Sequence, residues 1–249
     1  VATWIKVWPA AILAAAVIAV RRRLAVIGAA AAVSGVTLGA VLLLGGAAYA
    51  FGFVSDQTGR GLQVESPVST FYLWDAMLGG PSQIFYDPDL LTFEVSGPAV
   101  NPVIAVMTPL LAVGVLGIAA LGAYKMWRGA HFSAVFPTLS LALVAAFIAL
   151  NKVGSPQYMV WLSVPLVIAL VLDRRRWVGP AVVVLAIAAA TQIIYPMVYF
   201  DLLVALPFPV VVITIRNILL VVIAAWAVVK LARVRTRSSF TRKVGALAA

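Results

Sequence analysis

The chain has no cysteine and only one histidine, His131, among its 249 residues. The absence of cysteine excludes disulfides, thiolate metal sites and cysteine nucleophiles. A single histidine cannot form an imidazole cluster for a metal ion. We therefore expect neither a metal site nor a cofactor. Any chemistry of this protein must use carboxylates, amines, hydroxyls and amides.

Charged residues are also scarce: they make up 10% of the chain, whereas hydrophobic residues make up 64%. A soluble domain has about 25% charged and about 45–50% apolar residues. With a mean hydropathy of +1.09, this composition excludes a soluble domain and indicates a membrane protein. The net charge of +10 does not predict a nucleic-acid partner, because the basic residues form short clusters between apolar stretches.

Seven apolar stretches are candidates for membrane-spanning helices, which need about 20 apolar residues each. We predict an all-α, polytopic transmembrane helix bundle of about seven spans, forming a single domain over residues 1–249. The sixth stretch contains Pro196, which predicts a kink or an exit from the membrane near Tyr195. The predicted spans are Trp4 to Val20, Leu24 to Ala48, Pro102 to Tyr124, Phe132 to Leu150, Gln157 to Leu172, Val178 to Phe200 and Pro207 to Val229.

The basic clusters predict the orientation, because lysine and arginine in short loops stay on the cytoplasmic side. Each cluster follows an odd-numbered stretch, so the N-terminus is expected outside and the basic tail 230–249 in the cytoplasm. Since the chain starts at Val1 without a signal peptide, we expect it to be the later part of a longer protein. The clusters are Arg21 to Arg23, Lys125 with Arg128, Arg174 to Arg176, and Lys230 to Lys243.

One long connection, the outer-face loop 51–101, separates the second and third spans. It is too aromatic for a disordered linker. We expect a short interfacial helix over Ser69 to Leu78, with Phe71, Tyr72 and Trp74 at headgroup depth. Functional residues should be sought on this outer face, because the cytoplasmic turns are minimal.

Arg216 is the most informative charged residue, because it lies inside the seventh stretch next to Asn217. Ionisable side chains at membrane depth are costly and mark functional sites. Arg216 either extends to the outer headgroups or faces inward, where it binds an anion or a buried acid. A planar guanidinium suits phosphate, to which it donates two parallel hydrogen bonds.

A second group of polar residues stands where the fifth stretch begins, in the run NKVGSPQY. Ser155 is a suitable helix N-cap, and Lys152 beside a helix N-terminus attracts anions. Gln157 and Tyr158 follow on the same segment. An ordinary capped helix with an interfacial lysine and tyrosine explains the pattern equally well.

Two further candidates are Lys6, between two tryptophans at the start of the first stretch, and Glu65 in the loop. Lys6 is either an interfacial anchor or a third outer cation beside Lys152 and Arg216. Glu65 stands in the run RGLQVES with Arg60, and the glycines there permit a tight backbone near a ligand. A carboxylate in such a place is a candidate general base.

Four segments together resemble the polytopic glycosyltransferases of the GT-C class, family 87. They are WIKVWP at the start, RGLQVES from Arg60 to Ser66, KVGSPQYMVW from Lys152 to Trp161, and Arg216 with Asn217. The resemblance spans most of the chain in the same order, although no single motif is specific.

The resemblance implies a membrane enzyme, a hexosyltransferase of the bacterial plasma membrane, with actinobacterial composition. It would take a sugar, usually mannose, from a polyprenyl-phosphate carrier and attach it to an envelope glycolipid or glycan on the outer face. The catalytic acid of such enzymes lies in a first extracytoplasmic loop that no segment here matches. The resemblance therefore implies that the catalytic acid belongs to a portion that precedes this chain, and that this chain supplies the carrier-binding half. Within the chain, Glu65 is the candidate. The expected substrate-binding residues are Lys6, Arg60, Lys152, Ser155, Gln157, Tyr158, Arg216 and Asn217.

Two other functions remain open. A transporter or flippase for a lipid-linked substrate would also bind phosphate with cations and helix ends. A noncatalytic membrane subunit would need no catalytic loop. The aromatic outer segment favours an acceptor-binding surface and hence the transferase.

Overall fold

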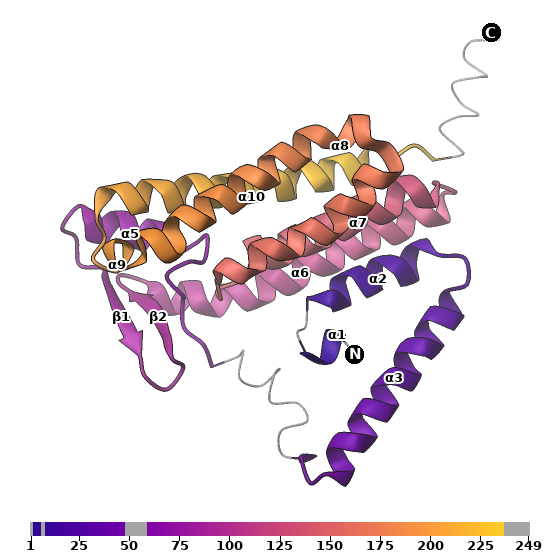
Figure 1. Cartoon of the computed structure of the whole chain (residues 1–249), viewed down its shortest axis with the longest axis horizontal. Coiled ribbons are helices and arrows are strands. Elements are labelled where there is room, and N and C mark those ends of the chain that lie inside the picture. The colour runs from indigo at the N-terminus through magenta and orange to yellow at the C-terminus, as the bar shows by residue number, and fades with distance from the viewer. Residues whose placement is uncertain (1, 6–7, 48–58, 237–249) are drawn as a thin grey trace.

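The computed structural model describes residues 2–5, 8–47 and 59–236 of the chain (Figure 1). Helices dominate, as predicted, and within the described ranges five helical stretches are long and apolar enough to cross a membrane. A helical membrane bundle is therefore confirmed. These stretches are α3 (Arg23–Leu43), α6 (Val100–Trp127), α7 (Phe132–Ala149), the run Pro156–Met197, and α10 (Pro207–Ala232).

The run Pro156–Met197 contains the 3-10 helix η2 (Pro156–Leu162), α8 (Ser163–Gln192) and the π-helix η3 (Ile193–Met197). The backbone leaves helical geometry inside α8 at Asp173, with φ −157° and ψ 76°. Both ends of the run line one cavity, while its middle lies beside His131 at the other end of the bundle. The run therefore folds back on itself and accounts for the fifth and sixth predicted spans.

The first predicted span, Trp4 to Val20, is not one long helix in the described residues. It contains α1 (Ala2–Ile5) and α2 (Pro9–Ala19), and Pro9 is the first residue of α2. Eleven residues extend only about 16 Å, about half the hydrocarbon thickness. The continuous helix thus begins only at Pro9, five residues after the predicted start at Trp4.

Helix α7 forms the centre of the bundle, and α2, α6, α8 and α10 pack around it. The side chains of thirteen of its residues are buried. Gly122 on α6 allows close contact, because a Cβ there would lie 2.6 Å from a methyl carbon of Leu139 on α7. Helix α3 differs: it diverges from the bundle and buries none of its residues (Figure 1). Its apolar surface suits lipid contact.

The part of the outer-face loop that the structure describes folds against one end of the bundle (Figure 1). Helix α5 (Thr70–Met77) confirms the predicted short helix, and Phe71 is exposed. Tyr72, however, is buried, and the Trp74 indole N–H donates to Thr214 Oγ1 at 2.9 Å. These two rings therefore hold the loop to the protein.

An antiparallel hairpin of β1 (Gln83–Asp87) and β2 (Thr92–Ser96), which the sequence analysis did not predict, follows α5. Its register pairs Gln83 with Ser96 and Asp87 with Thr92. The chain turns after Asp87, where the Asp87 carboxylate accepts the backbone N–H groups of Asp89 and Leu90. The hairpin and the short helix α9 (Tyr199–Leu203) lie at the same end as α5 (Figure 1).

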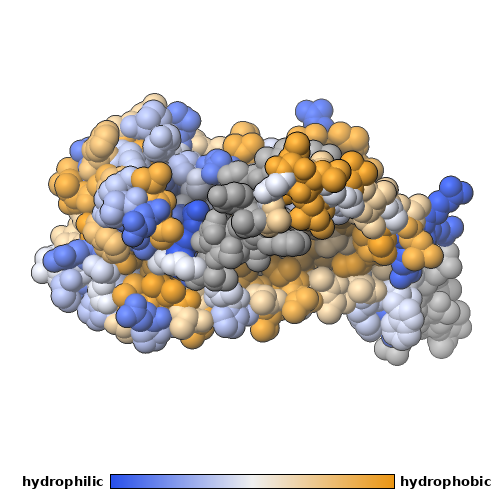
Figure 2. Space-filling view, turned by 90° about the horizontal axis from the view of Figure 1, so that it is seen from below, coloured by the Kyte–Doolittle hydropathy of each residue, from blue (hydrophilic) through white to orange (hydrophobic). Residues whose placement is uncertain are grey.

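The described basic clusters gather at the other end. One cavity there is lined by Arg21, Arg23 and His131, and a second by His131, Arg176 and Arg233. Lys125 donates to the carbonyls of Ala232 and Val234, which joins the ends of α6 and α10. On the face shown in Figure 2, hydrophilic residues gather mainly toward the two ends, and hydrophobic residues cover much of the surface between them. The clusters thus share one end, as the alternating pattern predicted.

Candidate functional site

The two polar motifs of the sequence analysis lie against each other in the structure. The backbone N–H of Gln63 donates to the carbonyl of Lys152 at 3.0 Å, and the Gly154 N–H donates to Gln63 Oε1 at 3.1 Å. About ninety positions separate these segments in the chain. Their contact places Glu65 beside the start of η2.

Gly154 permits this contact because its backbone approaches the chain at Glu65 and Ser66. A Cβ at position 154 would lie 2.4 Å from the Ser66 nitrogen and 2.5 Å from the Glu65 carbonyl carbon. Both neighbours are backbone atoms, so neither can move without displacing the Glu65 segment.

We expect the substitution Gly154→Ala to destabilise the protein by about 1–3 kcal/mol, the usual cost of overpacking. Thermal unfolding in detergent, followed by circular dichroism, measures the effect. Gly179→Ala is the matched control, because nothing lies within 4 Å of a Cβ at that helical position. Equal midpoints for the two variants would contradict the close contact.

Glu65 is the acidic residue at the centre of the site, and it is only 5% exposed. Its Oε2 lies 3.5 Å from Arg216 Nη1, and Arg216 Nη2 donates to its backbone carbonyl. Burial raises the pKa of Glu65 to about 7, and the opposing effects of Arg216 and of the Tyr199 hydroxyl are smaller. A carboxyl group with this pKa can accept and release a proton near neutral pH.

Arg216 faces inward and meets a buried acid, which is one of the two interpretations of its sequence position. Its side chain is 1% exposed, and Nε and Nη2 donate to Asn217 Oδ1 at 3.1 and 2.8 Å. Asn217 Nδ2 donates in turn to Thr70 Oγ1 at 2.8 Å. Arg216 and Asn217 thus lie behind Glu65 and do not line the cavity beside it.

A cavity of about 530 Å³ opens beside Glu65 at this end of the bundle. Five of the predicted site residues line it: Arg60, Glu65, Ser155, Gln157 and Tyr158. The Arg60 Nε atom is buried and has no hydrogen-bond partner among the described residues. Arginine, amide, hydroxyl and carboxyl groups therefore converge on one space, as a polar ligand requires.

Two tyrosines that the sequence analysis missed complete the cavity. Tyr195 and Tyr199 line it from η3 and α9, and the helical path breaks at Tyr195 as predicted. Burial and the nearby Glu65 both raise the pKa of the Tyr199 hydroxyl, so this group stays protonated. Their spacing of four residues after an apolar helix was the available signal.

Three further predicted site residues remain to be placed: Lys152, Ser155 and Lys6. Lys152 is buried outside the cavity lining, and burial lowers its pKa although Glu94 opposes that effect. Ser155 is the N-cap residue of η2, but its side chain makes no capping hydrogen bond. Lys6 lies outside the described residues. No group of three potential metal-ligating side chains occurs within the part of the chain that the structure describes.

Comparisons with protein-family models, curated proteins and solved structures give no match to this chain. The resemblance to the glycosyltransferases therefore stays a prediction. The fold and the site define a helical membrane protein with several membrane-crossing segments and a polar cavity at the end opposite its basic clusters.

Proposed function

We propose that the protein is a membrane glycosyltransferase that moves a sugar, mannose by the resemblance, from a polyprenyl-phosphate carrier to a glycolipid or glycan acceptor. The observation that carries the proposal is the convergence of Glu65 and Arg60 on one polar cavity. A carboxyl with a pKa of about 7, and a guanidinium whose buried Nε atom has no hydrogen-bond partner among the described residues, are groups that such a transfer can use.

In the proposed reaction, the Glu65 carboxylate removes the proton from the acceptor hydroxyl. The acceptor oxygen then attacks the anomeric carbon as the bond from that carbon to the phosphate oxygen breaks. The carrier phosphate leaves with the bonding electron pair, and Arg60 stabilises its charge. Gln157 and Tyr158, which also line the cavity, supply hydrogen bonds to sugar hydroxyls. No metal or cofactor enters this scheme.

The site location supports an outer-face reaction in the bacterial plasma membrane. The cavity lies at the end opposite the basic clusters, which the positive-inside rule assigns to the cytoplasm. The exposed apolar surfaces of α3 and α6 suit contact with membrane lipids and with the polyprenyl chain.

The direct test is an assay of membranes that contain the protein for transfer of mannose from radiolabelled polyprenyl-phosphate-mannose. We expect a new glycosidic bond in the wild type. Movement of the lipid between leaflets without such a bond would support the transporter instead. Neither activity, from inserted and folded protein, would support the noncatalytic subunit.

Replacing Arg60 with glutamine is expected to lower kcat/KM for the lipid-phosphate donor by about ten- to a hundredfold, the usual effect of losing a hydrogen bond to a charged group. Initial rates over a range of donor concentrations measure it. Arg175→Gln, at the far end of the bundle, is the matched control with an equal charge change. Unchanged kinetics of Arg60→Gln would remove Arg60 from the phosphate site.

A further inference from the structure

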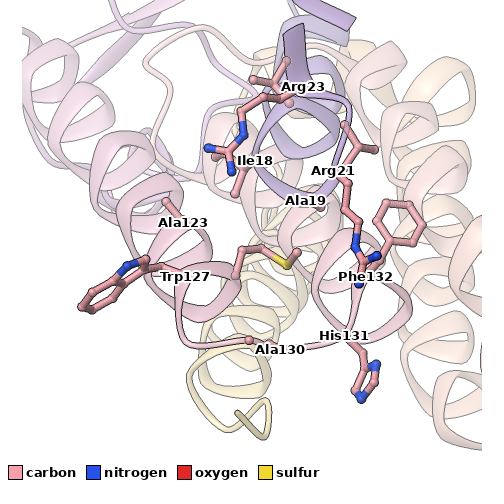
Figure 3. A pocket seen from close by; sticks show the side chains of 13 residues that line it. Ile18, Ala19, Arg21, Arg23, Ala123, Trp127, Ala130, His131 and Phe132 are labelled. Carbon is pink, nitrogen blue, oxygen red and sulfur yellow. The ribbon is translucent and has the colours of Figure 1, made fainter. Parts of the chain in front are cut away.

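A larger cavity, of about 800 Å³, lies at the opposite end of the bundle, between the α2–α3 turn and the α6–α7 turn. Figure 3 shows Arg21 and Arg23 extending from the α2–α3 turn on two sides of this space. His131 and Phe132 border it from the α6–α7 turn. The proposed transferase reaction uses none of these residues.

The charged side chains that line this cavity of about 800 Å³ are all positive. Its lining residues include the cationic Arg21 and Arg23 and no carboxylate. Among the residues that the structure describes, the two ion pairs are Arg176 with Asp173 and Arg216 with Glu65. The two guanidiniums in the cavity thus have no acidic partner there, and an anion would balance them.

Apolar side chains form much of the remaining wall. Ile18 and Val17 contribute from α2, and Met126 and Ala123 contribute from α6. Trp127 lies at the edge and is 79% exposed. Tryptophan and arginine are typical of the membrane interface, where an apolar tail meets a polar headgroup. The site therefore suits a ligand that is both anionic and apolar.

We propose that this cavity binds the phosphate headgroup of an anionic phospholipid from the leaflet at the basic end of the bundle. The guanidiniums of Arg21 and Arg23 hold the phosphate oxygens by paired hydrogen bonds, and the acyl chains lie along α2 and α6. Basic loops can be attracted to an anionic membrane surface without any cavity. Here, by contrast, Arg21 and Arg23 both line one cavity, which can hold a single headgroup.

The test is native mass spectrometry of the purified chain in detergent, titrated with phosphatidylglycerol. We expect the double variant Arg21→Gln/Arg23→Gln to weaken retention of the lipid by about tenfold or more, since hydrogen bonds to charged groups are lost. Arg174→Gln/Arg175→Gln is the matched control: it removes the same charge at the same end, from residues that line neither cavity there.

A second pair of variants leaves the charge unchanged. Ala123→Trp fills the cavity and should weaken lipid retention, while Ala112→Trp, three helical turns away on the same face of α6, should not. Equal retention by both double arginine variants would overturn the proposal, as would normal retention by Ala123→Trp. Binding of inorganic phosphate as tight as that of phosphatidylglycerol would also overturn it, because the site would then not recognise a lipid.

Discussion

Replacing Glu65 with glutamine is expected to lower the rate of sugar transfer by about 10²- to 10⁴-fold, the contribution usual for a general base. Glutamine keeps the size of the side chain but cannot accept the acceptor proton. The donor KM should change little, because Arg60 and not Glu65 is proposed to hold the phosphate. Initial rates with radiolabelled donor, at saturating donor concentration, measure the loss.

The pH dependence of the wild type provides an independent check. Since the pKa of Glu65 is about 7, about a tenth of the carboxyl groups are ionised at pH 6 and about nine tenths at pH 8. A base must be unprotonated, so the rate should rise with pH through this interval. Activity of Glu65→Gln near the wild-type level would show that Glu65 is not the base.

Removal of the Arg216 side chain is expected to have the largest effect on stability. The substitution Arg216→Met leaves the buried Glu65 carboxylate without its ion pair and should cost about 3–5 kcal/mol, the usual cost of breaking a buried pair. It also removes the donor to the Glu65 carbonyl and the two bonds to Asn217 Oδ1. Chemical unfolding in detergent measures the loss, which should be larger at pH 8 than at pH 6, because an ionised Glu65 needs the pair most.

The double variant Arg216→Met/Glu65→Gln tests whether the unpaired Glu65 carboxylate causes the loss of stability in Arg216→Met. Because it removes both charges together, we expect it to recover much of the stability that Arg216→Met loses. Asp173 and Arg176 form a matched control pair at the surface, where an Arg176→Met change should cost about 1 kcal/mol or less. Equal losses in Arg216→Met and the double variant would contradict the pairing.

The helices were predictable because they follow from the apolar content of each stretch. The location of the basic clusters at one end was predictable from the order of charged residues along the chain. Arg216 was recognisable for the same reason: a guanidinium within an apolar helix must find a partner. The identity of that partner was not predictable from local pattern, since Glu65 lies 151 positions away in a loop. Only the tertiary structure decides between an anionic ligand and a buried acid.

The hairpin of β1 and β2 could not be predicted from the sequence, and neither could the position of Tyr199 beside Glu65. The strands are five residues each and do not alternate cleanly between buried and exposed side chains. Tyr199 reaches the site because the chain breaks its helix at Tyr195 and resumes in α9. Pro196 indicated the break at Tyr195, but the direction in which the chain continues after the break depends on packing that the local residues do not show.

The tight passage at Gly154 also limits how sequences with this fold can diverge. A relative that keeps the contact between the two motifs must keep glycine at position 154, because every other side chain begins with the atom that has no room there. Glu65 and Arg216 should be kept or lost as a pair, since either charge alone is costly to bury. Glycine and this paired charge together form a signature by which distant relatives can be recognised, even where the apolar helices have changed beyond alignment.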